Sequence, residues 1–565
     1  MERVPAKICD VLVESGVEYV FGIPGGGTIP IYDALYDRQD KIKTVMVRHE
    51  QAAACMADAY GRLTGKPAVV MGQGAFIGSS ATFGVMEAFL ASSPMLVLTD
   101  TSDSRFAQQA NYQCGTGDYG GIDLLGIFRS VSKYAALATT PKEAVQGVQI
   151  AIKHAVSGRP GPACVVMRTA AISGEVDPDA IPRIYPSGGY LNTIKPVAPE
   201  EEIRRLIGIL ASATNPVLIA GNGVHAAKAY QELMELAELY SMPVATSYKG
   251  KSAFPETHPL ALGMIGAFGQ RLANTVVGEA DVLLVVGCKL SPSDTMNQNI
   301  DLIDPNRQRI IQIDIEPRNA GWTYPVEVGL IGDAKAILRQ ILRASSEVVS
   351  KKEERIELLG QRKRELSFFE DAELHSDETP MLPQRLVRLL EETLDSSAII
   401  TLDAGNNRVW MAHYFRTKEA GTMLCPGGIA GMGWAPPAAL AAKLLYPDRP
   451  CIGIAGDGGF MMSVHVLSTA CQYDLPVIFI VMNNSELGMV RRGQGNRPIA
   501  TEFIDTDHAK IAQAFGCEGI RVEKPQELAP AVRHAIASRK PTVIDVIIQR
   551  EEGIAKLRGG LARRR

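Results

Sequence analysis

The sequence predicts an α/β protein made of three consecutive, doubly wound parallel-sheet domains. Short runs of Val, Ile and Leu alternate with helical stretches almost throughout its 565 residues. Continuous apolar strands separated by helices are typical of parallel sheets that helices cover on both faces. The predicted strands are residues 67–71, 94–100, 162–167, 216–221, 281–287, 309–314, 398–403, 451–456, 476–482 and 541–548.

Two stretches break this alternation and divide the chain. Residues 171–200 are rich in Pro, Gly and Asp, which indicates a linker. Residues 345–380 are dense in charge, which indicates an exposed helix followed by a loop. The breaks predict domains at residues 1–175, 195–345 and 375–550, followed by a basic tail at 551–565.

The composition excludes several classes of protein. Apolar residues make up 46% and charged residues 21%, as in an ordinary soluble globular protein, and the net charge of −4 gives no sign of nucleic-acid binding. The first 22 residues lack the apolar segment of a secretory signal, and no apolar run approaches the ~20 residues that a bilayer requires. The nine cysteines are scattered without a Cys-x-x-Cys pair. We therefore expect a reducing, cytoplasmic location, with neither a membrane nor a nucleic acid as partner.

Glycine and polar residues follow two of the apolar strands in the last domain. Gly456-Asp457-Gly458 comes directly after one strand, and Asn484 lies 27 positions after Asp457, at the end of the next strand. This distance accommodates a strand–helix–strand unit that places two parallel strands side by side. Glycine lets backbone N–H groups approach phosphate oxygens, and Asp and Asn supply hard oxygen ligands. The pattern predicts a magnesium diphosphate site; the alternative is an ordinary turn with a capping Asp.

Gly-Asp-Gly followed at this distance by Asn-Asn resembles the binding motif of thiamine diphosphate (ThDP) enzymes. The resemblance implies that Asp457, Asn484 and the backbone carbonyl at Glu486 ligate Mg²⁺. It also implies that Met432 is the large apolar residue that bends the coenzyme, whereas an ordinary core Met is the alternative. The remaining cofactor contacts that it implies are Pro24, Gly25, Gly74, Gly405, Asn406, Gly428, Gly456, Gly458, Gly459, Leu487, Gly488, Met489 and Val490.

Glu50 stands where an apolar strand enters an Ala-rich helix, an unusual place for a surface charge. By resemblance to the pyrimidine domain of this family, Glu50 would hydrogen bond N1′ of the ThDP aminopyrimidine. Burial raises the pKa of such a carboxyl group, so that it can share a proton. The alternative role is favourable electrostatics at a helix N-terminus. In this family the Glu and the Gly-Asp-Gly motif act across a subunit boundary, which implies a homodimer or homotetramer.

The resemblance covers nearly the whole chain and is strongest to acetohydroxyacid (acetolactate) synthase. The stretches that carry it are residues 17–35, 48–62, 431–444 and 483–490. It implies a C–C bond forming or cleaving enzyme that decarboxylates pyruvate and adds the product to a 2-oxo acid. The chain is also similar to 2-hydroxyacyl-CoA lyase and oxalyl-CoA decarboxylase, so an acyl-CoA substrate is the alternative. A third interpretation is a nucleotide-binding or structural protein with an inert ThDP site, and Glu50 argues against it.

Several residues depart from the synthase pattern. Tyr119-Gly120-Gly121 stands where the synthases have Phe-Gln-Glu, and Tyr119 fits the oxalyl-CoA decarboxylases better. Gln73 replaces a Pro in the synthase loop, and either Gln73 or Gln113 could donate a hydrogen bond to a substrate oxygen; the alternative is a satisfied loop amide. Arg491 and Arg492 could bind a carboxylate or phosphate, or form a solvated rim.

The central domain carries a weak dinucleotide-binding pattern. Gly221-x-Gly223-x-x-Ala226 follows a predicted strand, but no clear acidic residue lies about 20 positions further on. In this family the central domain binds FAD, ADP or neither. The basic tail could fold over a nucleotide, as in the CoA-handling relatives, or be disordered.

Overall fold

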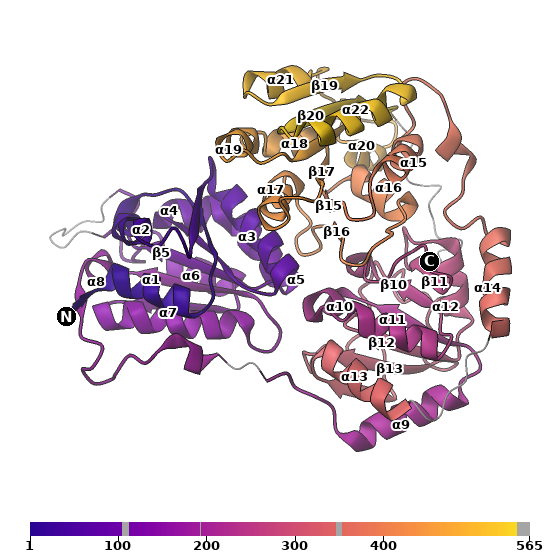
Figure 1. Cartoon of the computed structure of the whole chain (residues 1–565), viewed down its shortest axis with the longest axis horizontal. Coiled ribbons are helices and arrows are strands. Elements are labelled where there is room, and N and C mark those ends of the chain that lie inside the picture. Colours follow the sequence, from indigo (N-terminus) through magenta and orange to yellow (C-terminus); the bar gives the residue numbers. More distant parts are fainter. Residues whose placement is uncertain (104–111, 192–193, 346–352, 551–565) are drawn as a thin grey trace. The chain divides into compact units, whose positions relative to one another are not determined.

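The computed structural model describes residues 1–103, 112–191, 194–345 and 353–550 (Figure 1). These residues form three six-stranded sheets in which all neighbouring strands are parallel, which confirms the predicted α/β fold class. The described residues also form one short antiparallel pair, β1 (Glu2–Arg3) with β8 (Glu175–Val176). The chain makes up two compact units, Met1–Thr193 with Pro426–Pro447 and Met461–Leu475, and Ile194–Cys425 with Asp448–Phe460 and Pro476–Arg565.

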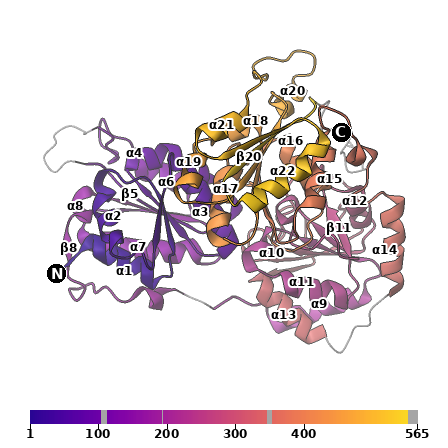
Figure 2. The same cartoon turned by 45° about the horizontal axis from the view of Figure 1, so that its top comes forward.

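The first sheet has the strand order β3-β2-β4-β5-β7-β6. Helices α1 and α7 cover one face, as Figure 2 shows, and α3 and α5 pack against each other on the other face. The direction of the chain across the sheet reverses between β2 and β4, and ligands of open α/β sheets bind where the strand order reverses. The elements are β2 (Tyr19–Gly22), β3 (Lys43–Met46), β4 (Ala68–Gly72), β5 (Met95–Asp100), β6 (Tyr134–Ala138), β7 (Pro162–Met167), α1 (Val4–Glu14), α3 (Glu50–Thr64), α5 (Thr82–Ala91) and α7 (Pro141–Val156).

The central sheet has the order β11-β10-β9-β12-β13-β14, which is the order of dinucleotide-binding folds. It reverses between β9 and β12. The elements are β9 (Pro216–Ala220), β10 (Val244–Thr246), β11 (Ala261–Met264), β12 (Val282–Val286), β13 (Arg309–Asp314), β14 (Val328–Ile331), α9 (Glu200–Ser212), α11 (Tyr230–Leu239), α12 (Arg271–Gly278) and α13 (Ala334–Ser345). The exposed helix expected within residues 345–380 is α14 (Glu353–Glu365), in which Leu359 is buried.

The third sheet, β16-β15-β17-β18-β20-β19, repeats the strand order of the first. Its order reverses between β15 and β17. The elements are β15 (Ile399–Leu402), β16 (Met423–Leu424), β17 (Cys451–Gly456), β18 (Ile478–Asn483), β19 (Glu518–Val522), β20 (Thr542–Ile547), α15 (Pro383–Thr393), α16 (Asn406–Tyr414), α18 (Asp457–Met462) and α22 (Pro525–Ser538).

Each sheet is the centre of a separate apolar core. In the described residues all nine cysteines are free thiols, and seven of them are buried. Cys164 lies in β7, Cys288 follows β12, and Cys451 lies in β17, so each of the three sheets holds a buried thiol. Burial raises the pKa of the Cys164 and Cys288 thiols to about 12.

The predicted linker and one apolar helical stretch differ from what the sequence indicated. The predicted linker, residues 171–200, is ordered at its start, because β8 pairs with β1 beside the first sheet. Among the described residues, the helical stretch Gly74–Ala91 is long and apolar enough by composition to cross a membrane, and 50% of it is buried inside the structure. Its last part is α5, which packs on α3 in the way that a core helix does.

Candidate functional site

Asp457 and Asn484 follow two neighbouring strands at the carboxyl edge of the third sheet. Strands β17 and β18 are paired in parallel, so the loops that follow them begin side by side. Asp457 is 5% exposed. Its carboxylate accepts hydrogen bonds from the N–H groups of Gly458 and Ser485, each at 2.7 Å. The bond from Ser485 ties the two loops together and fixes the turn that carries Asn484.

Gly488 marks a small space that side chains from two loops surround. A Cβ atom at this position would lie 3.0 Å from Nδ2 of Asn406 and 3.2 Å from Oε1 of Glu486. It would also lie 3.4 Å from Nδ2 of Asn484, whose amide donates to Glu486 at 3.3 Å. The Oδ1 atom of Asn406 is buried and has no hydrogen-bond partner among the described residues. Only glycine leaves this space open, and the unpaired amide oxygen of Asn406 lies beside it. The space therefore suits a polar ligand.

The carboxylates at this edge are placed for a cation. Burial raises the pKa of Asp457, although the N–H groups of Gly458 and Ser485 lower it. Burial also raises the pKa of Glu486, which Arg550 and Arg491 lower and Asp457 raises further. Because a divalent cation favours the charged carboxylate, it would offset this cost of burial.

The donor set also fits magnesium. Among the described residues no three His, Cys, Asp or Glu side chains gather as a metal site. The predicted ligands are instead one carboxylate, one amide and one backbone carbonyl, from Asp457, Asn484 and Glu486. Mg²⁺ usually takes one or two protein carboxylates and completes its shell with waters and substrate phosphates. The residues present therefore fit a magnesium ion that carries a diphosphate.

A second layer of buried polar groups, which the sequence pattern did not reveal, supports this turn. The Asn483 amide donates to Asp545 at 3.0 Å, and its oxygen accepts from Ser485 N–H at 3.2 Å. Asp545 also accepts from the backbone N–H of His508 at 3.1 Å. Arg550 Nε donates to the carbonyl of Asn484 at 3.0 Å. Asn483 is thus bound within the protein, so that Asn484 is the amide at the ligand edge.

The other predicted cofactor contacts of the second unit lie where β15, β17 and β18 end and the helices after them begin. Gly405 has φ +119°, a conformation that favours glycine, and it is the N-cap residue directly before α16. A Cβ on Gly456 would meet nothing within 4 Å, so the end of β17 is open. These residues are Gly405, Asn406, Gly456, Gly458, Gly459, Leu487, Gly488, Met489 and Val490.

Glu50, in the first unit, is the first residue of α3 and is half-buried. His49 caps this helix, with its Nδ1 accepting from the N–H of Gln51 at 3.3 Å. The ring of His49 stacks on His465 at 5.4 Å between centroids, and burial lowers the pKa of His465 to about 4. Glu50 is therefore presented at the start of a capped helix, beside a stacked pair of imidazoles.

Asp100 organises the loops at the point where the first sheet reverses. This fully buried carboxylate accepts from the N–H groups of Gly27 at 2.9 Å, Gly74 at 3.1 Å and Ser102 at 2.9 Å. The predicted contacts Pro24 and Gly25 lie in the same loop as Gly27. One carboxylate at the end of β5 thus binds the loops after β2 and β4, and the sequence pattern did not single it out.

Gln73 and Gln113 come together, whereas Tyr119 does not join them. The Gln73 amide donates to Gln113 Oε1 and, at 3.2 Å, to Ser102 Oγ. Gln113 has φ +66°, which is uncommon for a residue other than glycine. Tyr119 is fully exposed, with a relative accessibility of 103%. The Gln73 amide is thus bonded to Gln113 and Ser102 beside the Asp100 loops.

Gly428 and Met432 lie in the loop before α17 (Ala435–Leu445), within the first unit. The N–H of Gly428 donates to Oε1 of Glu87 at 2.7 Å. Met432 is partly exposed, so its side chain is not enclosed in a core as an ordinary core methionine would be.

The central glycines, Gly221 and Gly223, lie where that sheet reverses. A Cβ on Gly221 would lie 2.3 Å from the carbonyl oxygen of Gly287, and one on Gly223 would lie 2.5 Å from Gly287 Cα. Both glycines therefore allow the loops after β9 and β12 to touch backbone to backbone.

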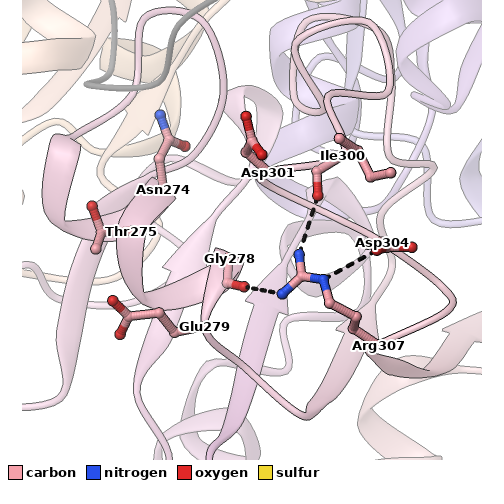
Figure 3. Close-up of a pocket in the computed structure, with 8 residues that line it drawn as sticks. All are labelled: Asn274, Thr275, Gly278, Glu279, Ile300, Asp301, Asp304 and Arg307. Carbon is pink, nitrogen blue, oxygen red and sulfur yellow. Dashed lines mark hydrogen bonds and ion pairs between the residues drawn. The ribbon is translucent and has the colours of Figure 1, made fainter.

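A cavity of about 490 Å³ opens at the other edge of the central sheet (Figure 3). Its walls precede β12 and β13 and so lie at the amino ends of strands, opposite the edge where nucleotides bind. The Arg307 guanidinium in its wall donates to Asp304 at 3.1 Å and to the carbonyls of Ile300 and Gly278 at 3.2 and 3.4 Å. This arginine is engaged in holding the cavity wall. The lining residues are Asn274, Thr275, Gly278, Glu279, Ile300, Asp301, Asp304 and Arg307.

Comparison with known proteins gives a consistent assignment along the chain. Three models of thiamine pyrophosphate enzymes match it: the N-terminal TPP binding domain at residues 3–119, the central domain at 203–341 and the C-terminal TPP binding domain at 403–546. A probable acetolactate synthase large subunit of Methanocaldococcus jannaschii is 34% identical over 560 residues, covering 97% of this chain and 92% of the relative.

Two further relatives agree over similar lengths. A probable acetolactate synthase large subunit of Methanococcus aeolicus is 34% identical over 96% of this chain and 92% of its own length. The acetolactate synthase isozyme 3 large subunit of Escherichia coli (strain K12) is 31% identical over 97% of this chain and 96% of its own length.

Proposed function

The chain belongs to the thiamine pyrophosphate enzyme family, and on that premise we propose that it is a ThDP- and Mg²⁺-dependent carboligase of 2-oxo acids. In this proposal it decarboxylates pyruvate and joins the remaining two-carbon unit to a second 2-oxo acid. The names of its relatives, acetolactate synthase large subunits, support this choice. The observation that carries it is the meeting of Asn406, Asn484 and Glu486 around the space at Gly488, next to Asp457.

The residues of the third sheet would hold the coenzyme's diphosphate. The Asp457 carboxylate, the Asn484 amide oxygen and the carbonyl at Glu486 would ligate Mg²⁺, and Gly488 leaves the room that the diphosphate needs. When bound, ThDP supplies a carbanion that attacks a carbonyl carbon and an electron sink for the loss of CO₂. Glu50 would hold a proton at N1′ of the aminopyrimidine, and Met432 would set the bend of the coenzyme. Gln73 and Gln113 would orient a substrate oxygen.

The site is proposed to be completed by a second copy of the chain, in a dimer or tetramer. We expect that co-expression of Glu50→Gln and Asp457→Asn subunits, each with little or no activity alone, restores activity. A mixed dimer would then hold one site with an intact Glu50 from one copy and an intact Asp457 from the other. If Glu50 served the diphosphate site of its own copy, both sites of the mixed dimer would be defective. Mixed dimers isolated through two different affinity tags, with no more turnover than either parent, would contradict the shared site.

An acyl-CoA substrate is the second candidate, as in 2-hydroxyacyl-CoA lyase or oxalyl-CoA-type decarboxylase. Tyr119 favours it, because the synthases carry Phe-Gln-Glu at residues 119–121. The basic tail that would contact the nucleotide lies outside the described residues. A substrate screen separates the two candidates: pyruvate and other 2-oxo acids should release CO₂ and give acetoin-type products, whereas 2-hydroxyacyl-CoA thioesters should give aldehydes.

The remaining expectations belong to the same proposal. The domain limits are 1–175, 195–345 and 375–550, and the location is cytoplasmic. The central domain would bind FAD, ADP or neither. Flavin absorbance in the purified protein would favour FAD, and an increase of the melting temperature with ADP or CoA would favour the CoA-handling branch.

A further inference from the structure

Three ionisable side chains are enclosed together in the first unit, outside the proposed coenzyme contacts. Asp58 and Arg62 lie on α3, and Glu87 lies on α5. Nη2 of Arg62 lies 2.7 Å from Asp58 and 2.7 Å from Glu87, while both carboxylate side chains have no exposed surface. Buried ion pairs give little net stability compared with apolar packing. Such a cluster therefore calls for a reason other than stability.

Both ends of the loop at residues 427–434 are bound to this cluster. Oε1 of Glu87 accepts from the N–H groups of Gly427 and Gly428, each at 2.7 Å, and Oε2 accepts from Ala430 at 2.9 Å. At the other end, Asp58 accepts from Nε1 of Trp434 at 2.9 Å. The Arg62 guanidinium also lies 4.7 Å from the centre of the Trp434 ring.

The loop has little freedom to move away from α5. Ala430 has φ +55° and Gly433 has φ +86°, so the backbone adopts a specific, tight shape. A Cβ on Gly428 would lie 2.6 Å from the carbonyl oxygen of Glu87, and one on Gly431 would lie 2.3 Å from the Phe83 ring. The loop thus touches α5 through its backbone.

We propose that Glu87 is a positioning residue that sets the place of Met432 for the coenzyme. This inference rests on the proposed function. Glu87 accepts hydrogen bonds from loop N–H groups that precede Met432, and Asp58 accepts one from Trp434, which follows it. Asp58 and Arg62 lie two and three turns along the helix that begins with Glu50. The ion cluster would thereby fix the loop that carries Met432 onto α3 and α5.

The electrostatics agree with a tightly held loop. Although burial raises the pKa of Glu87, Arg62 and the N–H groups of Gly428, Ala430 and Gly427 together hold it below its usual value. Glu87 therefore stays ionised at neutral pH and offers charge-assisted acceptors, which are stronger than neutral ones.

The test compares ThDP binding by the wild type and by Glu87→Gln, measured by calorimetric titration with excess Mg²⁺. We expect the dissociation constant to rise roughly tenfold or more, because a neutral amide replaces a charged acceptor of three loop N–H groups. Glu232→Gln is the matched control. Glu232 is also a buried partner of an arginine, Arg339 at 2.9 Å, but it lies in the central domain. This control should lower the melting temperature and leave the dissociation constant unchanged.

A double-mutant cycle with Met432→Ala separates positioning from loss of stability. If Glu87 acts through Met432, the effects of Glu87→Gln and Met432→Ala on ThDP affinity will be non-additive, whereas Glu232→Gln will combine additively with Met432→Ala. Equal ThDP affinity in Glu87→Gln and wild type, or strict additivity, would overturn the inference alone. Absence of ThDP binding by the wild type would overturn the proposed function, and the inference with it.

A second variant covers the case in which Glu87→Gln does not fold. Gly431→Ala forces the same loop off Phe83 without touching the ion cluster. It should weaken ThDP binding in the same direction, and unchanged binding would contradict the proposal.

Discussion

Asp457→Asn is expected to weaken the binding of ThDP with Mg²⁺ by at least a hundredfold and to abolish turnover. The substitution removes the charged metal ligand, and its NH₂ group would face the N–H groups of Gly458 or Ser485. Changes in the residues behind metal ligands already cost 10–100-fold, so loss of the ligand should cost about that or more. Calorimetric titration gives the affinity. In thermal melts, ligand at about 100 times its dissociation constant stabilises the wild type by about 2.7 kcal/mol, and the variant should lose this.

Asp304→Asn provides the matched control. Asp304 is also a buried carboxylate that accepts from a backbone N–H, that of Asn306 at 3.0 Å, but it lies at the amino edge of the central sheet. The control should bind ThDP as the wild type does. Wild-type affinity in Asp457→Asn would remove the basis for the magnesium site.

Glu50→Gln is expected to lower turnover by roughly 10²–10⁴-fold, which is the usual contribution of a general acid–base group. Because glutamine retains a similar shape and can still form a hydrogen bond, the affinity for ThDP should change only a few-fold. The measurement is the turnover number at saturating ThDP and pyruvate, together with the ThDP dissociation constant. The predicted signature is therefore a loss in catalysis without a matching loss in coenzyme binding.

Glu143→Gln tests the alternative role of Glu50 at a helix N-terminus. Glu143 lies in the first turn of α7 in the same unit and takes part in a capping box with Thr140. Because glutamine can also complete a capping box, its substitution should lower stability by only about 0.3–1 kcal/mol, through the lost charge at the helix N-terminus, and leave turnover unchanged. If Glu50→Gln behaved in the same way, Glu50 would be a helix-stabilising residue and the catalytic interpretation would be wrong.

Most inner strands could be predicted because their residues are apolar on both faces; among the described residues, the inner strands β2 and β10 were missed. Each of the ten predicted segments overlaps a strand of the structure. Among the strands that were not predicted are β3 and β14, at the sheet edges. In β14 buried and exposed residues alternate, and β3 is largely exposed, so neither forms a continuous apolar run. Edge strands are shorter and partly solvated, which weakens their sequence signal.

The residues proposed to bind the diphosphate could be identified from the sequence, whereas the buried carboxylates that hold the neighbouring loops could not. Asp457 and Asn484 each follow an apolar strand, so a local pattern reveals them. Asp100 and Glu87 act on backbone N–H groups that are distant in sequence; Glu87 and Gly428 are separated by 341 positions. A charge inside an apolar stretch shows only that some partner must exist, because an unpaired buried charge is costly. The fold alone identifies that partner.

The distribution of cysteines gives the protein an internal set of chemical reporters. Cys164 and Cys451 are buried in strands of two sheets and Cys288 is buried just after a strand of the third, so their reaction with a thiol reagent requires local opening of the core around each sheet. Mass spectrometry of labelled peptides could therefore measure the local opening of each of the three cores separately in one sample. A comparison with and without ThDP would then show in which of the three cores the coenzyme lowers the rate of labelling.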